Sequence, residues 1–155
     1  MNMQTTRPPL IAVVGATASG KTALGAEIAK AYGGEVISAD SMQLYQGLDI
    51  ATAKPTAEEM QGIPHHLISV LPPQQACSVA EYTEMARAKI EDILSRGKLP
   101  VVVGGTGLYI DALLDNIQFP DIPAAPELRA QLNANAKRFR EGMSALGFDL
   151  VPGHH

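Results

Sequence analysis

The chain is poor in several features that mark particular classes of protein. Its 155 residues include no tryptophan and one cysteine, Cys77, and aromatic residues make up only 5%. A single cysteine cannot form an internal disulfide, so we expect no redox role for Cys77 and a reducing, cytoplasmic location. The longest apolar runs, LIAVV and PVVVGG, are far shorter than a membrane span, and the first residues do not form a signal peptide. We therefore expect a soluble protein with no membrane partner.

An excess of basic residues is also missing. The formal net charge is -4, which argues against a generally basic nucleic-acid-binding protein but leaves room for a local basic patch. Apolar residues make up 46% and charged residues 18%, as in ordinary globular proteins. The length allows one domain with a core of Ala, Val, Ile and Leu. The composition becomes more polar and basic near Pro126, so we predict a core of residues 1–125 and a helical tail of residues 126–155.

Short apolar runs alternate along the chain with stretches of helical periodicity. Predicted strands lie at residues 10–14, 35–40 and 66–70 and in LPVVVGG. Predicted helices run from Thr22 to the Gly33-Gly34 pair, from Ser78 to about Gly97, and through LYIDALL. Ser78 and Glu81 have the spacing of a capping box. This alternation predicts an α/β fold with a parallel sheet and flanking helices, similar to that of P-loop NTPases.

The stretch GATASGKT matches the phosphate-loop pattern G-x-x-x-x-G-K-[ST] and lies between a predicted strand and a predicted helix. Backbone amides in such a loop turn toward phosphate oxygens, and the N-terminus of the helix adds partial positive charge. Lys21 supplies a mobile cation, and the Thr22 hydroxyl is suited to bind Mg²⁺. The predicted phosphate-binding residues are Gly15, Ala16, Thr17, Ala18, Ser19, Gly20, Lys21 and Thr22. None of these groups distinguishes ATP or GTP from a prenyl diphosphate.

Two further loops are expected at the same edge of the sheet. Asp40 ends a predicted strand and is followed by Ser41 and Gln43, and the turn GGTGLY with Thr106 follows another strand. Ligands of open α/β sheets bind at the carboxyl ends of the strands. Each loop also has a purely structural interpretation, Asp40 as a loop anchor and the glycines as a tight turn.

His65 and His66 raise the question of a metal site. Adjacent residues of a strand point to opposite faces, and no second His/Cys pair lies at ligand spacing. We therefore assign structural or solvent roles to these two residues and to His154 and His155.

Taken together, these motifs resemble the tRNA dimethylallyltransferase (tRNA isopentenyltransferase) family. The similar segments are GATASGKTALGAEIA, ISADSMQLYQGLDIATAKPT, GIPHHLI, SVAEYTEMA and GKLPVVVGGTGLYIDALL, and the resemblance runs from about Leu10 to about Leu132. It implies that the phosphate loop binds dimethylallyl diphosphate and that the prenyl group passes to N6 of an adenosine beside the anticodon of tRNA.

The resemblance also implies roles for individual residues. Lys21 and Mg²⁺ held by Thr22 would stabilise the departing pyrophosphate, and Asp40 would be the general base. The implied tRNA-binding residues are Asp40, Ser41, Met42, Gln43, Thr106 and Arg129, among which Ser41 to Gln43 would hold the flipped-out adenine and Thr106 would also be catalytic.

The chain departs from the family in two ways. Members of the family are much longer, and the missing part carries much of the tRNA-binding surface, so we expect truncation to impair tRNA binding. The last residues, 133–155, instead resemble a segment of glycine C-acetyltransferase that carries no cofactor lysine, which favours a truncated or chimeric chain.

Two other functions fit the phosphate loop. A small ATP-dependent kinase would need arginines to clamp the phosphoryl group, but only Arg87 and Arg96 lie between the loop and Pro126. A catalytically inert phosphate-binding module is the third interpretation.

Overall fold

A computed structural model describes most of the N-terminal part of the protein. The described residues are 9–50 and 52–115, followed by residues 130, 134–135, 137–139, 141 and 144–145. The chain divides into two compact units, residues 1–118 and 119–155. Pro126, where we predicted a boundary, lies outside the described residues, as do Arg129, His154 and His155.

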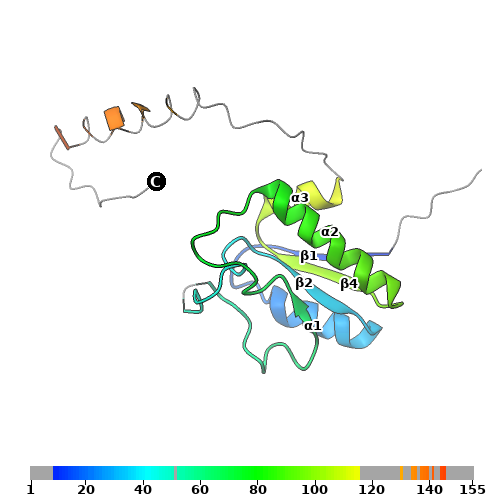
Figure 1. Cartoon of the computed structure of the whole chain (residues 1–155). Coiled ribbons are helices and arrows are strands. Elements are labelled where there is room, and N and C mark those ends of the chain that lie inside the picture. Colours follow the sequence, from blue (N-terminus) through cyan, green and yellow to red (C-terminus); the bar gives the residue numbers. More distant parts are fainter. Residues whose placement is uncertain are drawn as a thin grey trace, which may run out of the picture. The chain divides into compact units, whose positions relative to one another are not determined.

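The first unit contains a four-stranded sheet in the order β1-β4-β2-β3 (Figure 1). The strands are β1 (Ile11–Val14), β2 (Glu35–Ala39), β3 (His65–His66) and β4 (Pro100–Gly104). Every pairing is parallel, which confirms the predicted α/β parallel sheet. The carboxyl ends of β1, β2 and β4 therefore lie at one edge, where Val14 and Ala39 are both in register with Gly104.

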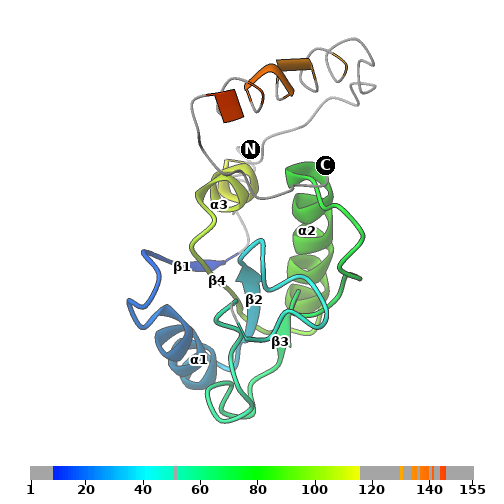
Figure 2. The same ribbon diagram turned by 90° about the vertical axis from the view of Figure 1, so that its left-hand side faces the viewer.

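Helices α1 (Lys21–Tyr32), α2 (Val79–Ser95) and α3 (Gly107–Leu114) cover the two faces of the sheet (Figure 2). Helix α1 lies on one side, and α2 and α3 lie on the other. Alternate side chains of the central strands pack on opposite faces of the sheet, because successive side chains of a strand point to opposite faces. Ile37 and Val102 join the core under α2 and α3, whereas Val36, Val101 and Val103 join the core that includes Ala29 of α1.

The ends of α2 follow the sequence signals closely. The Ser78 hydroxyl accepts a hydrogen bond from the Glu81 amide at 3.2 Å, and the Glu81 carboxylate accepts one from the Ser78 amide at 2.7 Å. This is the predicted capping box. Gly97 follows the helix with φ 71°, the left-handed conformation in which glycine carries no steric penalty.

The predicted strand at residues 66–70 is wrong in its extent. Only His65 and His66 pair with β2. Leu67 and Ser69 have φ values of 59° and 54°, which interrupt an extended strand. The amide of Ser69 instead donates to the Gln43 carbonyl at 2.8 Å. The chain therefore leaves the sheet after His66 and pairs with the loop that follows β2.

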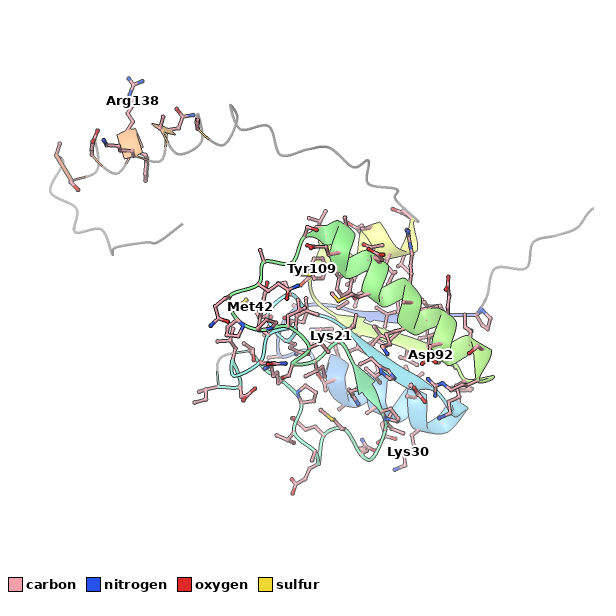
Figure 3. The ribbon with its side chains drawn as sticks, viewed as in Figure 1. Lys21, Lys30, Met42, Asp92, Tyr109 and Arg138 are labelled. Atoms are coloured by element: carbon pink, nitrogen blue, oxygen red, sulfur yellow. The ribbon has the colours of Figure 1, made fainter. Side chains whose placement is uncertain are left out.

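A cluster of charges holds the amino edge of the sheet together. The Glu35 carboxylate is buried, with 2% of the residue exposed. It accepts hydrogen bonds from Arg96 at 2.5 and 2.8 Å, from Lys98 at 2.7 Å and from His66 at 2.7 Å. The Arg96 guanidinium in particular holds the pKa of Glu35 far below its usual range. The side chain of Asp92, which also binds Arg96, lies at the end of the sheet away from Met42 (Figure 3).

The described residues of the second unit, among them Arg138 and Phe139, are helical. No helix in the described part of the chain has the length and apolarity needed to cross a membrane.

Candidate active site

The loop of residues 15–20 joins β1 to α1, in the position that the phosphate-loop motif requires. Its last residue, Gly20, has φ 82° and precedes the helix, and no side chain caps the amino end of α1. Helix α2, by contrast, has a full capping box. The first amides of a helix need hydrogen-bond partners. At α1 no side chain supplies such a partner, and the partial positive charge there favours an anion.

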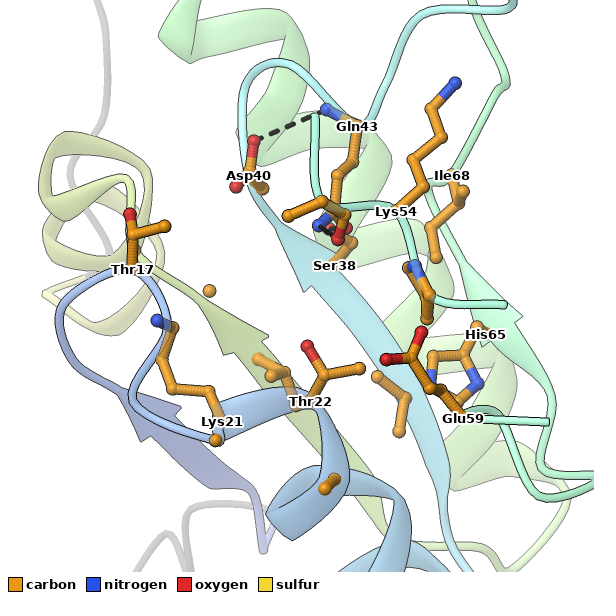
Figure 4. A pocket seen from close by; sticks show the side chains of 18 of the residues that line it. Thr17, Lys21, Thr22, Ser38, Asp40, Gln43, Lys54, Glu59, His65 and Ile68 are labelled. Atoms are coloured by element: carbon orange, nitrogen blue, oxygen red, sulfur yellow. Dashed lines mark hydrogen bonds between the residues drawn. The ribbon is translucent and has the colours of Figure 1, made fainter. Parts of the chain in front are cut away.

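The side chain of Lys21 folds back over this loop. Its ammonium group donates to the carbonyl of Ala16 and points toward Thr17, whereas the Thr22 hydroxyl faces the cavity beside it (Figure 4). The turn after β4 lies against the same loop. A Cβ atom on Gly105 would lie 3.2 Å from the Gly15 carbonyl oxygen and 3.9 Å from Lys21 Nζ. Two of the three predicted loops are therefore in direct contact.

A cavity of about 320 Å³ opens beside the loop (Figure 4). One side consists of the loop and the start of α1, and the opposite side includes residues between Ala53 and Ile68 for which no site role was predicted. The lining residues fall into three groups: residues 17–23 of the loop and α1; Val36, Ser38, Asp40, Gln43, Val103, Gly104 and Gly105 of the sheet and its loops; and Ala53, Lys54, Pro55, Glu59, His65 and Ile68. Lys21, Thr22, Asp40 and Gln43 thus surround one space, as the sequence predicted.

Asp40 is partly buried at the carboxyl end of β2. Its Oδ1 atom accepts hydrogen bonds from the amides of Met42 at 2.9 Å and Gln43 at 3.4 Å. The other carboxylate oxygen, Oδ2, has no hydrogen-bond partner among the described residues. One oxygen therefore anchors the turn, and the other is available to a ligand.

Thr106 connects the turn after β4 to the turn after β2. Its hydroxyl accepts a hydrogen bond from the Ser41 amide at 3.1 Å, and its own amide donates to the Ala39 carbonyl at 3.2 Å. Neither Thr106 nor Ser41 lines the cavity, and Met42, at 50% exposed, points to solvent. Of the six predicted tRNA-binding residues, Asp40 and Gln43 line the cavity, Ser41, Met42 and Thr106 lie around Asp40, and Arg129 lies outside the described residues.

Two stacked tyrosines support the turn from behind. The rings of Tyr82 and Tyr109 are 4.0 Å apart and nearly parallel, and the Tyr82 hydroxyl donates to the Ser38 carbonyl at 3.1 Å. Burial raises the pKa of Tyr109 to about 12. The neighbouring Cys77 is a free cysteine whose thiol pKa is raised by burial. Burial also raises the pKa of Tyr82.

The far wall of the cavity includes His65, to which we had given a structural role. Its Nδ1 atom lies 2.8 Å from the Ile63 carbonyl, and because a carbonyl only accepts, Nδ1 must carry the proton. Burial lowers the pKa of His65, which favours this neutral form. Its Nε2 atom is buried without a partner among the described residues. His66, on the other face of the strand, binds Glu35.

Metal binding by protein side chains alone is not supported in the described part of the chain. No group of three or more His, Cys, Asp and Glu side chains there is arranged to hold an ion. The Thr22 hydroxyl lines the cavity and is one possible ligand there.

Comparison with known proteins identifies relatives over nearly the whole chain. The sequence model of the IPP transferase family matches residues 43–148. The tRNA dimethylallyltransferases of an Exiguobacterium species and of Shouchella clausii are 50% and 53% identical over 145 and 134 residues, or 94% and 86% of this chain. Those matches cover 46% and 43% of the two relatives. The chain therefore spans less than half the length of the curated relatives it matches.

Solved structures of tRNA-modifying transferases also superpose on this chain. The tRNA isopentenylpyrophosphate transferase of Bacillus halodurans superposes with a TM-score of 0.73 at 48% identity, over 85% of this chain and 44% of that protein. A eukaryotic dimethylallyltransferase acting on tRNA superposes with a TM-score of 0.71 at 33% identity, over 82% of this chain and 32% of that protein.

The family match ends at residue 148 and overlaps most of residues 133–155, the segment for which the sequence suggested a separate origin. The resemblance of that segment to glycine C-acetyltransferase is not tested by these comparisons and stays a prediction.

Proposed function

Since the chain belongs to the IPP transferase family, we propose that it transfers the dimethylallyl group of dimethylallyl diphosphate to N6 of an adenosine beside the anticodon of tRNA. The observation that supports this most is the cavity itself. The uncapped end of α1, with Lys21 and Thr22, lines the same cavity as Asp40, whose Oδ2 has no hydrogen-bond partner among the described residues.

The loop would hold the leaving group. The C1–O bond of the allylic diphosphate breaks, and its electron pair leaves with the pyrophosphate. Negative charge therefore grows on the pyrophosphate oxygens held by the loop. Backbone amides of residues 15–20 and the ammonium of Lys21 stabilise that charge. Binding would require Lys21 to exchange the Ala16 carbonyl for a diphosphate oxygen. This exchange strengthens the interaction, because the new partner is charged.

Asp40 would receive the proton. The adenine N6 nitrogen forms its new bond to C1 of the prenyl group, and its surplus proton passes to Asp40 Oδ2. Because the turn is fixed through Oδ1, the carboxylate is held in place while Oδ2 acts. Thr106 would position this turn through its bond to the Ser41 amide.

A magnesium ion fits this site only as a partner of the diphosphate. Mg²⁺ commonly keeps several waters and binds substrate phosphates with one or two protein ligands. Thr22 can supply one such ligand, and the absence of a larger acidic cluster in the described residues agrees with that arrangement. When bound, the ion would neutralise charge on the pyrophosphate.

Binding of tRNA would be weak in this chain. A net charge of -4 provides little general attraction to RNA, and phosphate contacts supply much of the affinity for nucleic acids. We propose a cytoplasmic location, where tRNA is found.

A kinase activity is less well supported. Arg96 is held by Glu35 and Asp92 at the amino edge of the sheet, and the cavity lies at the carboxyl edge. Arg96 therefore cannot clamp a phosphoryl group at the loop.

Thermal unfolding in the presence of ligands tests the proposal. We expect dimethylallyl diphosphate with Mg²⁺ to raise the Tm more than ATP with Mg²⁺ at equal concentration, because a ligand that binds only the folded state stabilises it. A larger shift with ATP would favour a kinase. Stabilisation by the diphosphate without any transfer to an anticodon stem-loop would leave an inert binding module.

A further inference from the structure

Gln43 forms hydrogen bonds to several segments of the chain, more than its predicted role of holding the adenine would need. The residue is 9% exposed. Its Oε1 atom accepts a hydrogen bond from the Ser38 hydroxyl at 2.8 Å, and its Nε2 atom donates to the Ala53 carbonyl at 2.9 Å. Both ends of the side-chain amide are therefore already bonded inside the protein.

The backbone of Gln43 adds two further connections. Its amide donates to Asp40 Oδ1 at 3.4 Å, and its carbonyl accepts from the Ser69 amide at 2.8 Å. One residue thus contacts β2, the Asp40 turn and two segments that are distant in sequence.

Both of those segments contain a residue with unusual backbone. Ala53 and Ser69 have φ values of 47° and 54°, a conformation that residues with side chains rarely adopt without outside support. The Ala53 carbonyl accepts a hydrogen bond from Gln43 Nε2, and the Ser69 amide donates one to the Gln43 carbonyl. The residues beside them, Lys54, Pro55 and Ile68, line the cavity opposite the phosphate loop.

The geometry points to Gln43 as a positioning residue that holds the far wall of the cavity through Ser38 and Ala53. Its loss should therefore weaken binding of the allylic diphosphate even when no tRNA is present. This consequence rests on the proposed function, because it assumes that the diphosphate binds in this cavity.

The test uses Gln43→Met, which keeps the length of the side chain, adds no charge and removes both side-chain bonds. We expect the Kd for dimethylallyl diphosphate with Mg²⁺, measured by calorimetry without RNA, to rise about tenfold. Ser38→Ala cuts one of the two bonds and should raise the Kd by a smaller factor. Combined with Gln43→Met it should add little, since the partner is already lost. Gln46→Met changes an exposed side chain of the same loop and should leave the Kd unchanged.

A second measurement requires no ligand. Hydrogen exchange of the peptide covering residues 52–56 should accelerate in Gln43→Met and Ser38→Ala relative to wild type, and not in Gln46→Met. Unchanged exchange and an unchanged Kd in Gln43→Met, with only the KM for an anticodon stem-loop raised, would overturn the inference and assign Gln43 to the adenine. Failure of the wild-type protein to bind the diphosphate would refute the proposed function, and the exchange result would still decide the role of Gln43.

Discussion

At the scale of single residues, Asp40 combines a structural and a chemical role on two different oxygens. Asparagine can still accept the Met42 and Gln43 amide bonds through Oδ1, but its amide group cannot take up a proton. We expect Asp40→Asn to lower the rate of prenyl transfer at least about 100-fold, with the diphosphate Kd within about twofold of wild type. Single-turnover transfer to an anticodon stem-loop measures the first quantity and calorimetry the second.

The matched control is Asp111→Asn, an exposed carboxylate of α3. It should change neither the rate of prenyl transfer nor the diphosphate Kd. If Asp40→Asn instead weakened diphosphate binding strongly, Asp40 would be an anchor for the loop or a metal and not the base.

The two glycines that end β4 and begin its turn should respond differently to alanine. A Cβ on Gly104 would lie 2.2 Å from the Ala39 carbonyl oxygen, so Gly104→Ala must push two paired strands apart. We expect it to lower the free energy of unfolding by about 3 kcal/mol. Gly105→Ala meets only a 3.2 Å contact with the Gly15 carbonyl, so the fold should persist while the phosphate loop shifts and diphosphate binding weakens. Urea unfolding and calorimetry on both variants separate the two outcomes; equal loss of stability would contradict the assignment.

At the scale of secondary-structure elements, the two long helices begin in opposite ways. The cap of α2 is satisfied within the protein, so removing the Ser78 hydroxyl leaves the Glu81 amide without its partner. We expect Ser78→Ala to destabilise the protein by about 1 kcal/mol in urea unfolding, whereas Ser78→Thr should cost only a fraction of that. A result in which both variants matched wild type would show that the capping box adds nothing to stability.

The elements were predictable where their signals are local. The apolar runs of β1 and β4, the capping box of α2 and the glycine after each long helix all depend on residues close in sequence. The predicted strand at residues 66–70 failed because Ser69 and its neighbours bond to the loop after β2, a contact that no periodicity reveals.

The residues of the candidate site likewise divide into those that local motifs predicted and those that they did not. Lys21, Thr22 and Asp40 belong to short motifs and were identified from the sequence. Ala53 and His65 on the far wall were not, because their place is fixed by contacts between distant segments, such as the bond of Gln43 to Ala53. A buried glutamine with both amide ends bonded has no signature in a single sequence.

At the scale of the whole molecule, different groups lie at the carboxyl edge and at the amino edge of the sheet, which are the two ends of its parallel strands. The carboxyl edge carries the cavity, and the amino edge carries the ion cluster of Glu35. Glu35 of β2 meets His66 of β3, Arg96 after α2 and Lys98 before β4, so one carboxylate links four parts of the first unit. Removing its charge would leave Arg96 and Lys98 without their shared carboxylate.

That cluster should make the stability of the protein depend on pH. The pKa of Glu35 in the folded state is lowered mainly by Arg96, so its contribution is present above the unfolded-state pKa of about 4.3 and is lost as pH falls toward the folded-state value. We expect Glu35→Gln to lower the free energy of unfolding by about 2 kcal/mol at pH 7. Because Glu35 takes up its proton first in the unfolded state, the difference between the two proteins should begin to shrink below about pH 5 and keep shrinking toward about pH 2. Urea unfolding across that range measures it, with Glu84→Gln, at an exposed position of α2, as the control. A difference that stayed constant with pH would mean that Glu35 stabilises the sheet by packing and not by its charge.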